Sequence, residues 1–181
     1  AKANLDTIQY NYMVNAGYSW WTDAARKQPY SLSILVSEGK VLANAVPHEQ
    51  ATGCLIVYED NSVTVKQVAD ITAEQSVKFA VAGMTIAPKV LNAEEGFTGQ
   101  YADVLRETAR VVMGWHPGKE RVLIAGYEKM SAARGRDLLL ELGCTAGITL
   151  DGGGSALMRD AGHDVLETDG RYQFGCVWLD M

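Results

Sequence analysis

The chain is organised around residues 147–158, which read Gly147-Ile148-Thr149-Leu150-Asp151-Gly152-Gly153-Gly154-Ser155-Ala156-Leu157-Met158. An apolar run typical of a buried strand ends at Asp151, passes through three glycines and resumes after Ser155. Consecutive glycines are entropically costly in a folded chain, so they indicate turns with positive φ or the close approach of another molecule. Two interpretations stay open. One is a tight hairpin with Asp151 as a turn residue, and the other is an anion-binding loop of amide N–H groups flanked by Asp151 and Ser155.

The composition predicts one globular domain over residues 1–181, large enough to bury a core without disulfides or metals. The hydrophobic fraction of 48% and charged fraction of 21% are ordinary for such a domain. No apolar run approaches the roughly 20 residues that a membrane-spanning helix needs. The 16 Lys and Arg are outnumbered by 22 Asp and Glu, which argues against a nucleic-acid partner. A small anionic substrate stays compatible with this balance if the few local cations converge.

The metal-ligating residue types are sparse and scattered. The histidines are His48, His116 and His163, and the cysteines are Cys54, Cys144 and Cys176, without a Cys-x-x-Cys pair. We therefore expect no metal site and no cofactor, and buried reduced cysteines, with room for one disulfide in an exported protein. The chain begins at Ala1 without a signal peptide, so a processed form and an excised domain both fit. Its compartment stays open between secreted, cell-surface and viral.

The hydrophobic pattern predicts an α+β fold, a mainly antiparallel mixed sheet with about three helices. Period-two alternation and turn residues predict two hairpins, strands around a Pro-Gly turn, and strands at both ends of the chain. Helical spacing and caps predict helices in the middle and before the triple glycine. The expected strands are 8–14, 32–36, 41–45, 54–58, 63–68, 85–91, 108–115, 121–125, 156–159 and 172–179, and the expected helices include 73–82 and 131–142.

Two further stretches are candidates for a site. Trp20 and Trp21 follow a turn at Asn15–Tyr18, where they form either a hydrophobic plug or an aromatic wall of a ligand pocket. Arg110 interrupts an apolar strand, so it lies either at an exposed edge or inside a cleft with a partner. The residue types alone do not choose between these alternatives.

Three elements together resemble the phosphodiester glycosidase family. Leu150 to Ser155, Leu-Asp-Gly-Gly-Gly-Ser, is similar to the family signature. Asn15-Ala16-Gly17-Tyr18 is similar to its opening Asn-Gly-Gly-Tyr-Phe element, with Ala16 and Ser19 in place of Gly and Phe. Arg110 to Gly114 fits its Arg-Thr-Ala-Ile-Gly element, with Val111 in place of Thr. Ser131, at the start of the expected helix, also matches, and an N-cap alone accounts for that serine.

The resemblance implies a hydrolase that cleaves a glycosyl phosphodiester on a small molecule or glycan. It brings the three elements to one cleft, with Asp151 as the catalytic carboxylate and Arg110 as the phosphate ligand, because a guanidinium can donate two hydrogen bonds to a phosphate. Glu107 and Glu128 are candidates for a second acid. The implied substrate-binding residues are Asn15, Gly17, Tyr18, Gly152, Gly153, Gly154 and Ser155.

Two other functions compete with this hypothesis. A non-catalytic module of a larger surface or viral protein would use the same residues to bind a glycan or a sugar phosphate. A nucleotide-phosphate enzyme would use the triple glycine as a phosphate loop. That loop needs a Gly-Lys-Ser/Thr ending, and the chain has Gly154-Ser155-Ala156 instead.

Overall fold

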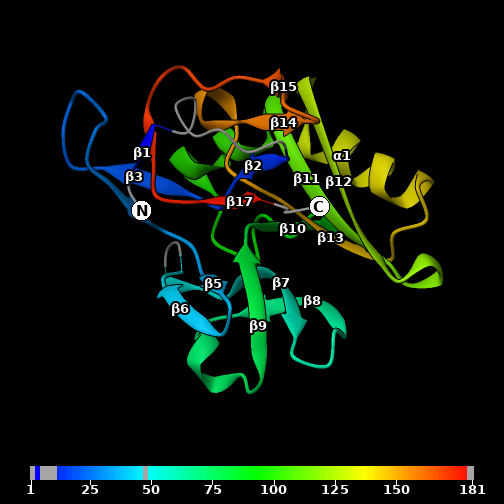
Figure 1. Cartoon of the computed structure of the whole chain (residues 1–181). Helices are drawn as coiled ribbons and strands as arrows, with labels where there is room; N and C mark the ends of the chain where they lie inside the picture. Colours follow the sequence, from blue (N-terminus) through cyan, green and yellow to red (C-terminus); the bar gives the residue numbers. More distant parts are fainter. Residues whose placement is uncertain (1–2, 5–11, 47–48, 179–181) are drawn as a thin grey trace.

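The structure is a computed structural model that describes residues 3–4, 12–46 and 49–178. Over these residues it consists mainly of antiparallel strands, with one α-helix, α1 (Ala132–Glu141), at one side of the molecule (Figure 1). The predicted mainly antiparallel mixed architecture is confirmed. The predicted number of helices is wrong, because about three were expected and the described residues form one α-helix. The described residues also contain short 3₁₀ helices at Ile71–Ala73, Gly99–Leu105, Pro117–Lys119 and Gly153–Ser155.

The strands pair in three larger sheets and two small ribbons. The central sheet has the order β10 (Met84–Ala87), β13 (Ala146–Thr149), β11 (Thr108–His116), β12 (Arg121–Met130). The five-stranded sheet has the order β6 (Lys40–Ala43), β5 (Leu35–Ser37), β9 (Val77–Ala82), β7 (Thr52–Tyr58), β8 (Val63–Val68). The third has the order β15 (His163–Leu166), β14 (Met158–Asp160), β2 (Met13–Asn15), β17 (Cys176–Trp178). The ribbons are β1 (Ala3–Asn4) with β16 (Tyr172–Gln173), and β3 (Ser19–Trp21) with β4 (Pro29–Ser31).

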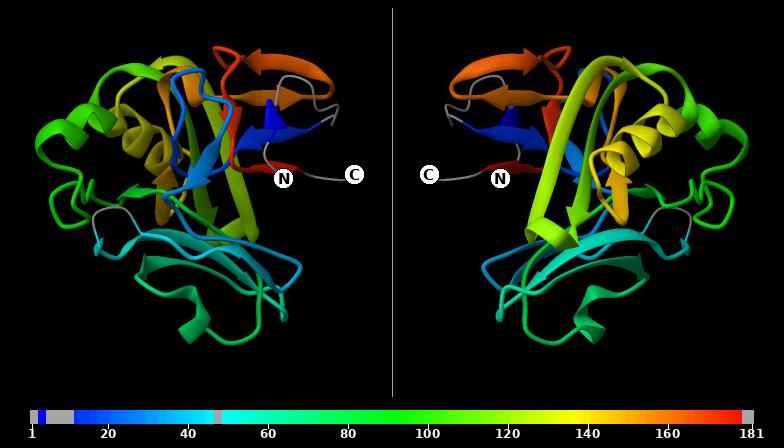
Figure 2. Two further views of the ribbon diagram at one scale, coloured as in Figure 1. Left: turned by 90° about the vertical axis from the view of Figure 1, so that its left-hand side faces the viewer. Right: turned by 90° about the vertical axis from the view of Figure 1, so that its right-hand side faces the viewer.

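The two faces of the central sheet pack against different layers, as its period-two pattern requires. Val112 on β11 packs with Leu139 of α1 on one face. Its neighbours Val111 and Met113 point the other way, toward Leu55 of the five-stranded sheet and the third sheet. Figure 2 shows the five-stranded sheet as a layer below the central one, with α1 beside β11 and β12. The triple glycine follows β13, so this sheet fixes where the loop begins.

Most sequence expectations hold at the level of elements. Both hairpins form, as β5–β6 and β7–β8, and the strands around the Pro-Gly turn are β11 and β12. Ser131 caps α1 by accepting a hydrogen bond from the Arg134 N–H at 3.2 Å, and Gly143 after the helix has φ +84°. The expected strand 172–179 is divided into β16 and β17 within the described residues. Most of the expected strand 8–14 lies outside the described residues, except for the start of β2.

The helix expected at 73–82 is wrong. Residues 77–82 form strand β9, which pairs with β5 on one side and β7 on the other. Ala80, Val81 and Ala82 are fully buried there, because the strand is covered on both faces. A short apolar run that is buried on both sides loses its alternation, so periodicity cannot distinguish it from helix.

The packing around Gly17 gives a first testable prediction. A Cβ atom at Gly17 would lie 2.2 Å from the Ala82 carbonyl oxygen and 2.6 Å from the Ser33 Cβ, both buried. We expect Gly17→Ala to lower the free energy of unfolding by about 1–3 kcal/mol, because neither group can move without disturbing the sheet. Urea denaturation measures this. Gly118→Ala is the control, since its Cβ meets only the His116 ring at 3.3 Å, and an unchanged Gly17→Ala protein would contradict the packing.

Candidate functional site

A cavity of about 280 Å³ opens beside the triple glycine, between β3, the Gly99–Leu105 turn and the start of β11. Small-molecule sites typically start at about 300 Å³, so its size suits a sugar-sized group. Eight residues that the sequence singled out lie in its wall: Tyr18, Trp20, Trp21, Arg110, Asp151, Gly152, Gly153 and Ser155. Asp151 and Arg110 therefore face one pocket, and Trp20 and Trp21 form part of its aromatic wall.

Asp151 is a half-buried carboxylate held at the end of β13. Burial raises its pKa from 3.8 to about 6, because removal from water disfavours the charged form. Hydrogen bonds from the Ser155 hydroxyl and from the Gly152 and Ser19 N–H groups, and the charge of Arg171, lower it in part. The carboxylate can therefore gain or lose a proton close to neutral pH.

The three glycines differ in their structural reasons. Gly153 has φ +62°, a left-handed conformation that favours glycine, and this confirms that the loop needs at least one. The N–H of Gly152 donates to Asp151 Oδ1 at 2.9 Å. Gly154 lies outside the pocket wall, and a Cβ there would be 2.3 Å from Asp169 Oδ2 and 2.4 Å from Arg171 Nη2.

Arg110 is almost fully buried, with an exposed fraction of 1%. Its Nε donates to the Met130 carbonyl at 3.1 Å and its Nη1 to Thr149 Oγ1 at 3.1 Å. Its Nη2 donates to the Val104 carbonyl at 2.6 Å and the Arg106 carbonyl at 3.0 Å. Burial lowers its pKa, and the nearby Asp151 carboxylate opposes that shift. The exposed-edge interpretation of Arg110 is wrong, because its buried guanidinium ties β11 to β12, β13 and the Gly99–Leu105 turn.

Asn15 and Gly17 must be corrected from substrate contacts to parts of the scaffold. Asn15 is fully buried, donates from Nδ2 to the Asp151 carbonyl at 2.9 Å and to the Ala16 carbonyl at 3.0 Å, and accepts from the Leu157 N–H at 3.0 Å. The bonds to Asp151 and Leu157 fix the backbone on both sides of the triple glycine. Gly17 is buried because Ala82, at the end of β9, and Ser33, between β4 and β5, pack against it, and neither Asn15 nor Gly17 lines the pocket.

Tyr18 lies in the pocket wall as expected, with its ring centroid 5.1 Å from that of Phe97. Its hydroxyl is buried and faces the Met84 backbone N–H without completing a hydrogen bond within the described chain. Burial raises the pKa of this hydroxyl, so it stays protonated at any working pH.

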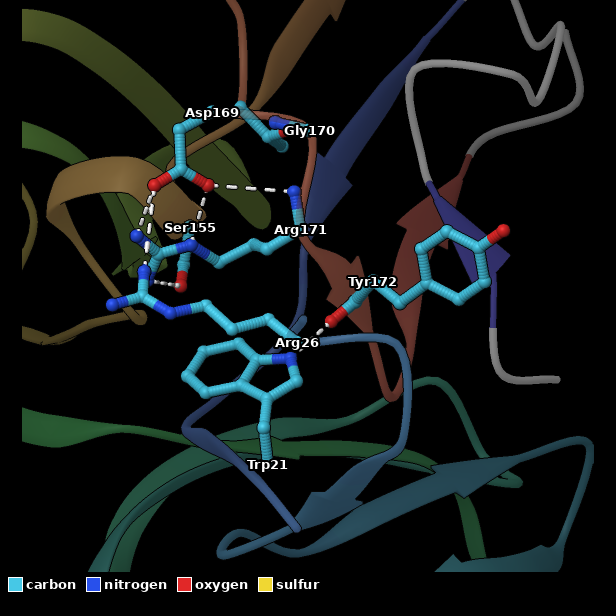
Figure 3. A network of polar contacts seen from close by, with 8 residues as sticks. Trp21, Arg26, Ser155, Asp169, Gly170, Arg171 and Tyr172 are labelled. Atoms are coloured by element: carbon cyan, nitrogen blue, oxygen red, sulfur yellow. Dashed lines mark hydrogen bonds and ion pairs between the residues drawn. The ribbon is translucent and has the colours of Figure 1, made fainter. Parts of the chain in front are cut away.

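Several pocket residues were not found from the sequence. Arg171, Arg106 and Asp103 bring charge to the wall, and Tyr101 adds an aromatic ring that is exposed by 42%. Figure 3 shows Arg171 beneath the Asp169 carboxylate, reaching toward Ser155 with Trp21 nearby. The sequence signal that could have indicated Arg171 is Asp169-Gly170-Arg171, in which an acid and a base flank a glycine. In the structure this glycine has φ +83° and lies in a bend.

The two acids considered as catalytic partners lie elsewhere. Glu107 has a side chain exposed by 58% beside Lys129, and Glu128 is exposed on β12. Neither lines the pocket, whereas Asp103 does. Among the described residues no group of three or more His, Cys, Asp or Glu is arranged to hold a metal ion. No helix in that part of the chain is long and apolar enough to cross a membrane.

The comparisons with known proteins bear on the fold. No family model matches the sequence, and no curated protein matches it. The structure is similar to a zebrafish N-acetylglucosamine-1-phosphodiester alpha-N-acetylglucosaminidase catalytic domain, auto-inhibited by its pro-peptide, with a TM-score of 0.68 and 18% identity. It is also similar to a hypothetical protein from Synechocystis, with a TM-score of 0.51 and 14% identity.

The chain spans about half of each of these proteins. The zebrafish match covers 88% of this chain and 56% of that one, and the Synechocystis match covers 93% and 51%. At 18% and 14% identity, these similarities show a shared fold and nothing more. This chain therefore has the fold of a domain that, in the zebrafish protein, belongs to a phosphodiester glycosidase.

Proposed function

We propose that the chain is a hydrolase that cleaves a glycosyl phosphodiester, the ester of a sugar 1-phosphate, in the pocket that Asp151 and Arg110 line. One observation carries the proposal. A half-buried carboxylate with a pKa raised to about 6 shares a small pocket with guanidinium groups. Perturbed carboxylates in pockets are candidate catalytic groups, and guanidinium suits a phosphate. The fold likeness to a phosphodiester glycosidase domain supports the same substrate class.

The reaction assigns separate tasks to the two ends of the pocket. The bond between the sugar C1 and the phosphate oxygen breaks, and its electron pair leaves with the phosphate. Water supplies the hydroxyl that C1 gains, and the proton that water loses passes to the carboxylate or to solvent. Asp151 attacks C1 or holds the attacking water, and in either role it must be ionised while C1 carries positive charge.

The remaining residues bind and orient. Arg110, in the pocket wall, contributes positive charge that favours the leaving phosphate, although most of its N–H groups already bond within the protein. Gly152, Gly153 and the Ser155 hydroxyl line the same wall, where bare backbone lets a substrate approach. Tyr18 adds an aromatic face for the sugar. Asn15 acts on the reaction through the Asp151 backbone, so it is a positioning residue.

A substrate panel tests the proposal. The wild-type chain is incubated with α-glycosyl phosphodiesters of several sugars, and the release of free sugar is measured. We expect turnover of at least one phosphodiester that depends on Asp151. Binding of these compounds without turnover would contradict catalysis and favour the alternative, a non-catalytic glycan or sugar-phosphate binding module, to which the exposed Trp20 and Tyr101 rings at the pocket are suited.

The pKa of Asp151 predicts the pH dependence of the reaction. Because the carboxylate must be ionised, kcat/KM should rise about tenfold per pH unit below pH 6 and level off above it. Initial rates in buffers of constant ionic strength between pH 4.5 and 8.5 measure this profile. A flat profile, or a rate that falls as the pH rises through 6, would contradict an ionised Asp151.

A further inference from the structure

Arg171 is held in one orientation by its neighbours. Asp169 accepts hydrogen bonds from Arg171 Nε at 2.6 Å and from Nη2 (Figure 3). The guanidinium carbon lies 5.1 Å from the centre of the Trp21 ring, and Trp21 itself is fixed by donating from Nε1 to the Tyr172 carbonyl at 2.6 Å. The side chain is exposed by only 15%. A guanidinium held in this way loses little further freedom when it binds a ligand.

Arg171 and Arg106 approach adjacent glycines of the same loop. A Cβ at Gly154 would lie 2.4 Å from Arg171 Nη2, and a Cβ at Gly153 would lie 3.0 Å from Arg106 Nη2. Arg106 is oriented in turn, since its Nη1 lies 2.9 Å from Asp103 Oδ2. The two guanidinium groups, called here the arginine pair, therefore lie over bare backbone at one end of the pocket, and both line it.

The arginine pair has donors to offer where Arg110 has few. Arg110 directs N–H groups to four protein acceptors out of its five N–H bonds. Arg171 uses Nε and Nη2 for Asp169, and its Nη1 is 3.4 Å from Ser155 Oγ, a long contact that a better acceptor can replace. Since Ser155 also bonds to the Asp151 carboxylate, this Nη1 faces the reacting end of the pocket.

We propose that the arginine pair, Arg171 and Arg106, binds the phosphate of the substrate at the Gly153 end of the pocket and selects phosphodiesters over neutral glycosides. This proposal rests on the proposed function. In this proposal, Arg110 stabilises the pocket wall through its hydrogen bonds to the protein and contributes positive charge without contacting the phosphate. The third glycine is explained as well, because any side chain at Gly154 would displace the Asp169–Arg171 pair.

Phosphate binding tests the arginine pair without turnover. Inorganic phosphate is titrated into the wild-type chain and into Arg171→Gln, Arg106→Gln and the control Arg134→Gln, whose side chain pairs with Glu141 on α1 outside the pocket. We expect each pocket variant to raise Kd about 10- to 100-fold, as the loss of charged hydrogen bonds predicts, with no change for Arg134→Gln. Wild-type affinity in both pocket variants, or no phosphate binding by the wild type, would overturn the proposal.

Turnover separates this proposal from the proposed function. For Arg171→Gln, kcat/KM should fall at least tenfold further for an α-glycosyl phosphodiester than for the 4-nitrophenyl α-glycoside of the same sugar, because only the phosphodiester presents a phosphate to the pair. Equal losses on both substrates would mean that Arg171 only maintains the fold of the pocket, and would overturn phosphate selection. A wild-type chain that binds phosphate through the pair but hydrolyses neither substrate would instead refute the hydrolase and leave the anion site in place.

Discussion

Asp151→Asn should lower kcat/KM for an α-glycosyl phosphodiester by about 10³-fold or more, a loss of about 4 kcal/mol of transition-state stabilisation. The amide has nearly the shape of the carboxylate and can still accept the Gly152 N–H, so the loop should keep its conformation. A neutral amide neither attacks C1 nor stabilises positive charge there. Initial rates with the phosphodiester measure the loss.

The same substitution should not destabilise the protein at neutral pH. The pKa of Asp151 is raised from 3.8 to about 6, so the folded state binds this proton more tightly than the unfolded state. Its contribution to stability is full below pH 3.8 and is lost as the pH rises through about 6. Above that pH, the buried charge of ionised Asp151 destabilises the folded state by about 3 kcal/mol at most. Asparagine has no charge, so it avoids this destabilisation.

Two measurements therefore separate catalysis from folding at this residue. Asp151→Asn should melt at or above the wild-type temperature at pH 7.5, and the difference should narrow toward pH 4. The matched control is Asp137→Asn on α1, outside the pocket, which should keep wild-type turnover. Turnover by Asp151→Asn within tenfold of wild type would contradict the catalytic role, and a parallel loss of melting temperature and activity would make Asp151 a turn residue.

Arg110→Lys should lower the free energy of unfolding by about 3–5 kcal/mol, because several buried carbonyl groups lose their donors at once. The Met130, Val104 and Arg106 carbonyl oxygens and the Thr149 hydroxyl lie on different sides of the guanidinium. One ammonium on a shorter stem cannot reach them all. Urea denaturation measures the loss.

Arg136→Lys is the control for this substitution. Arg136 lies on α1 with a side chain exposed by 34% and pairs with Asp137, so its replacement should change stability by less than about 1 kcal/mol. An Arg110→Lys protein as stable as wild type would mean that the buried hydrogen bonds of Arg110 contribute little. The guanidinium would then be available to bind phosphate directly, as the family resemblance implies.

The sequence predicted local signals well. The Ser131 cap and the Gly143 stop depend on neighbouring residues only, and both are present. The strands before the triple glycine carried long apolar runs, and β11 and β13 form as expected. Strand β9 was misassigned because burial on both faces, which only the tertiary structure supplies, hid its alternation. That residues 1–181 form one domain stays a prediction.

Part of the candidate site could be predicted from the sequence, namely the residues that stand out from their neighbours. Asp151 ends an apolar run and Arg110 interrupts one, so each is conspicuous in the sequence, and the fold brings both to one pocket. Asn15 also stands out in the sequence, but its side-chain amide bonds to backbone groups, two of which flank the glycines. Sequence spacing could not predict these hydrogen bonds. Arg171 and Arg106 were not singled out from the sequence, because only the fold brings them close to the loop.

Hydrolysis in ¹⁸O-labelled water tests the central claim most directly. If the chain cleaves the bond between the sugar C1 and the phosphate oxygen, the label enters the anomeric hydroxyl of the released sugar and the phosphate product stays unlabelled. Mass spectrometry of both products after one incubation, with Asp151→Asn as the blank, gives the answer. We predict label in the sugar alone. Label in the phosphate product would mean cleavage at phosphorus and would contradict a glycosidase that acts through Asp151.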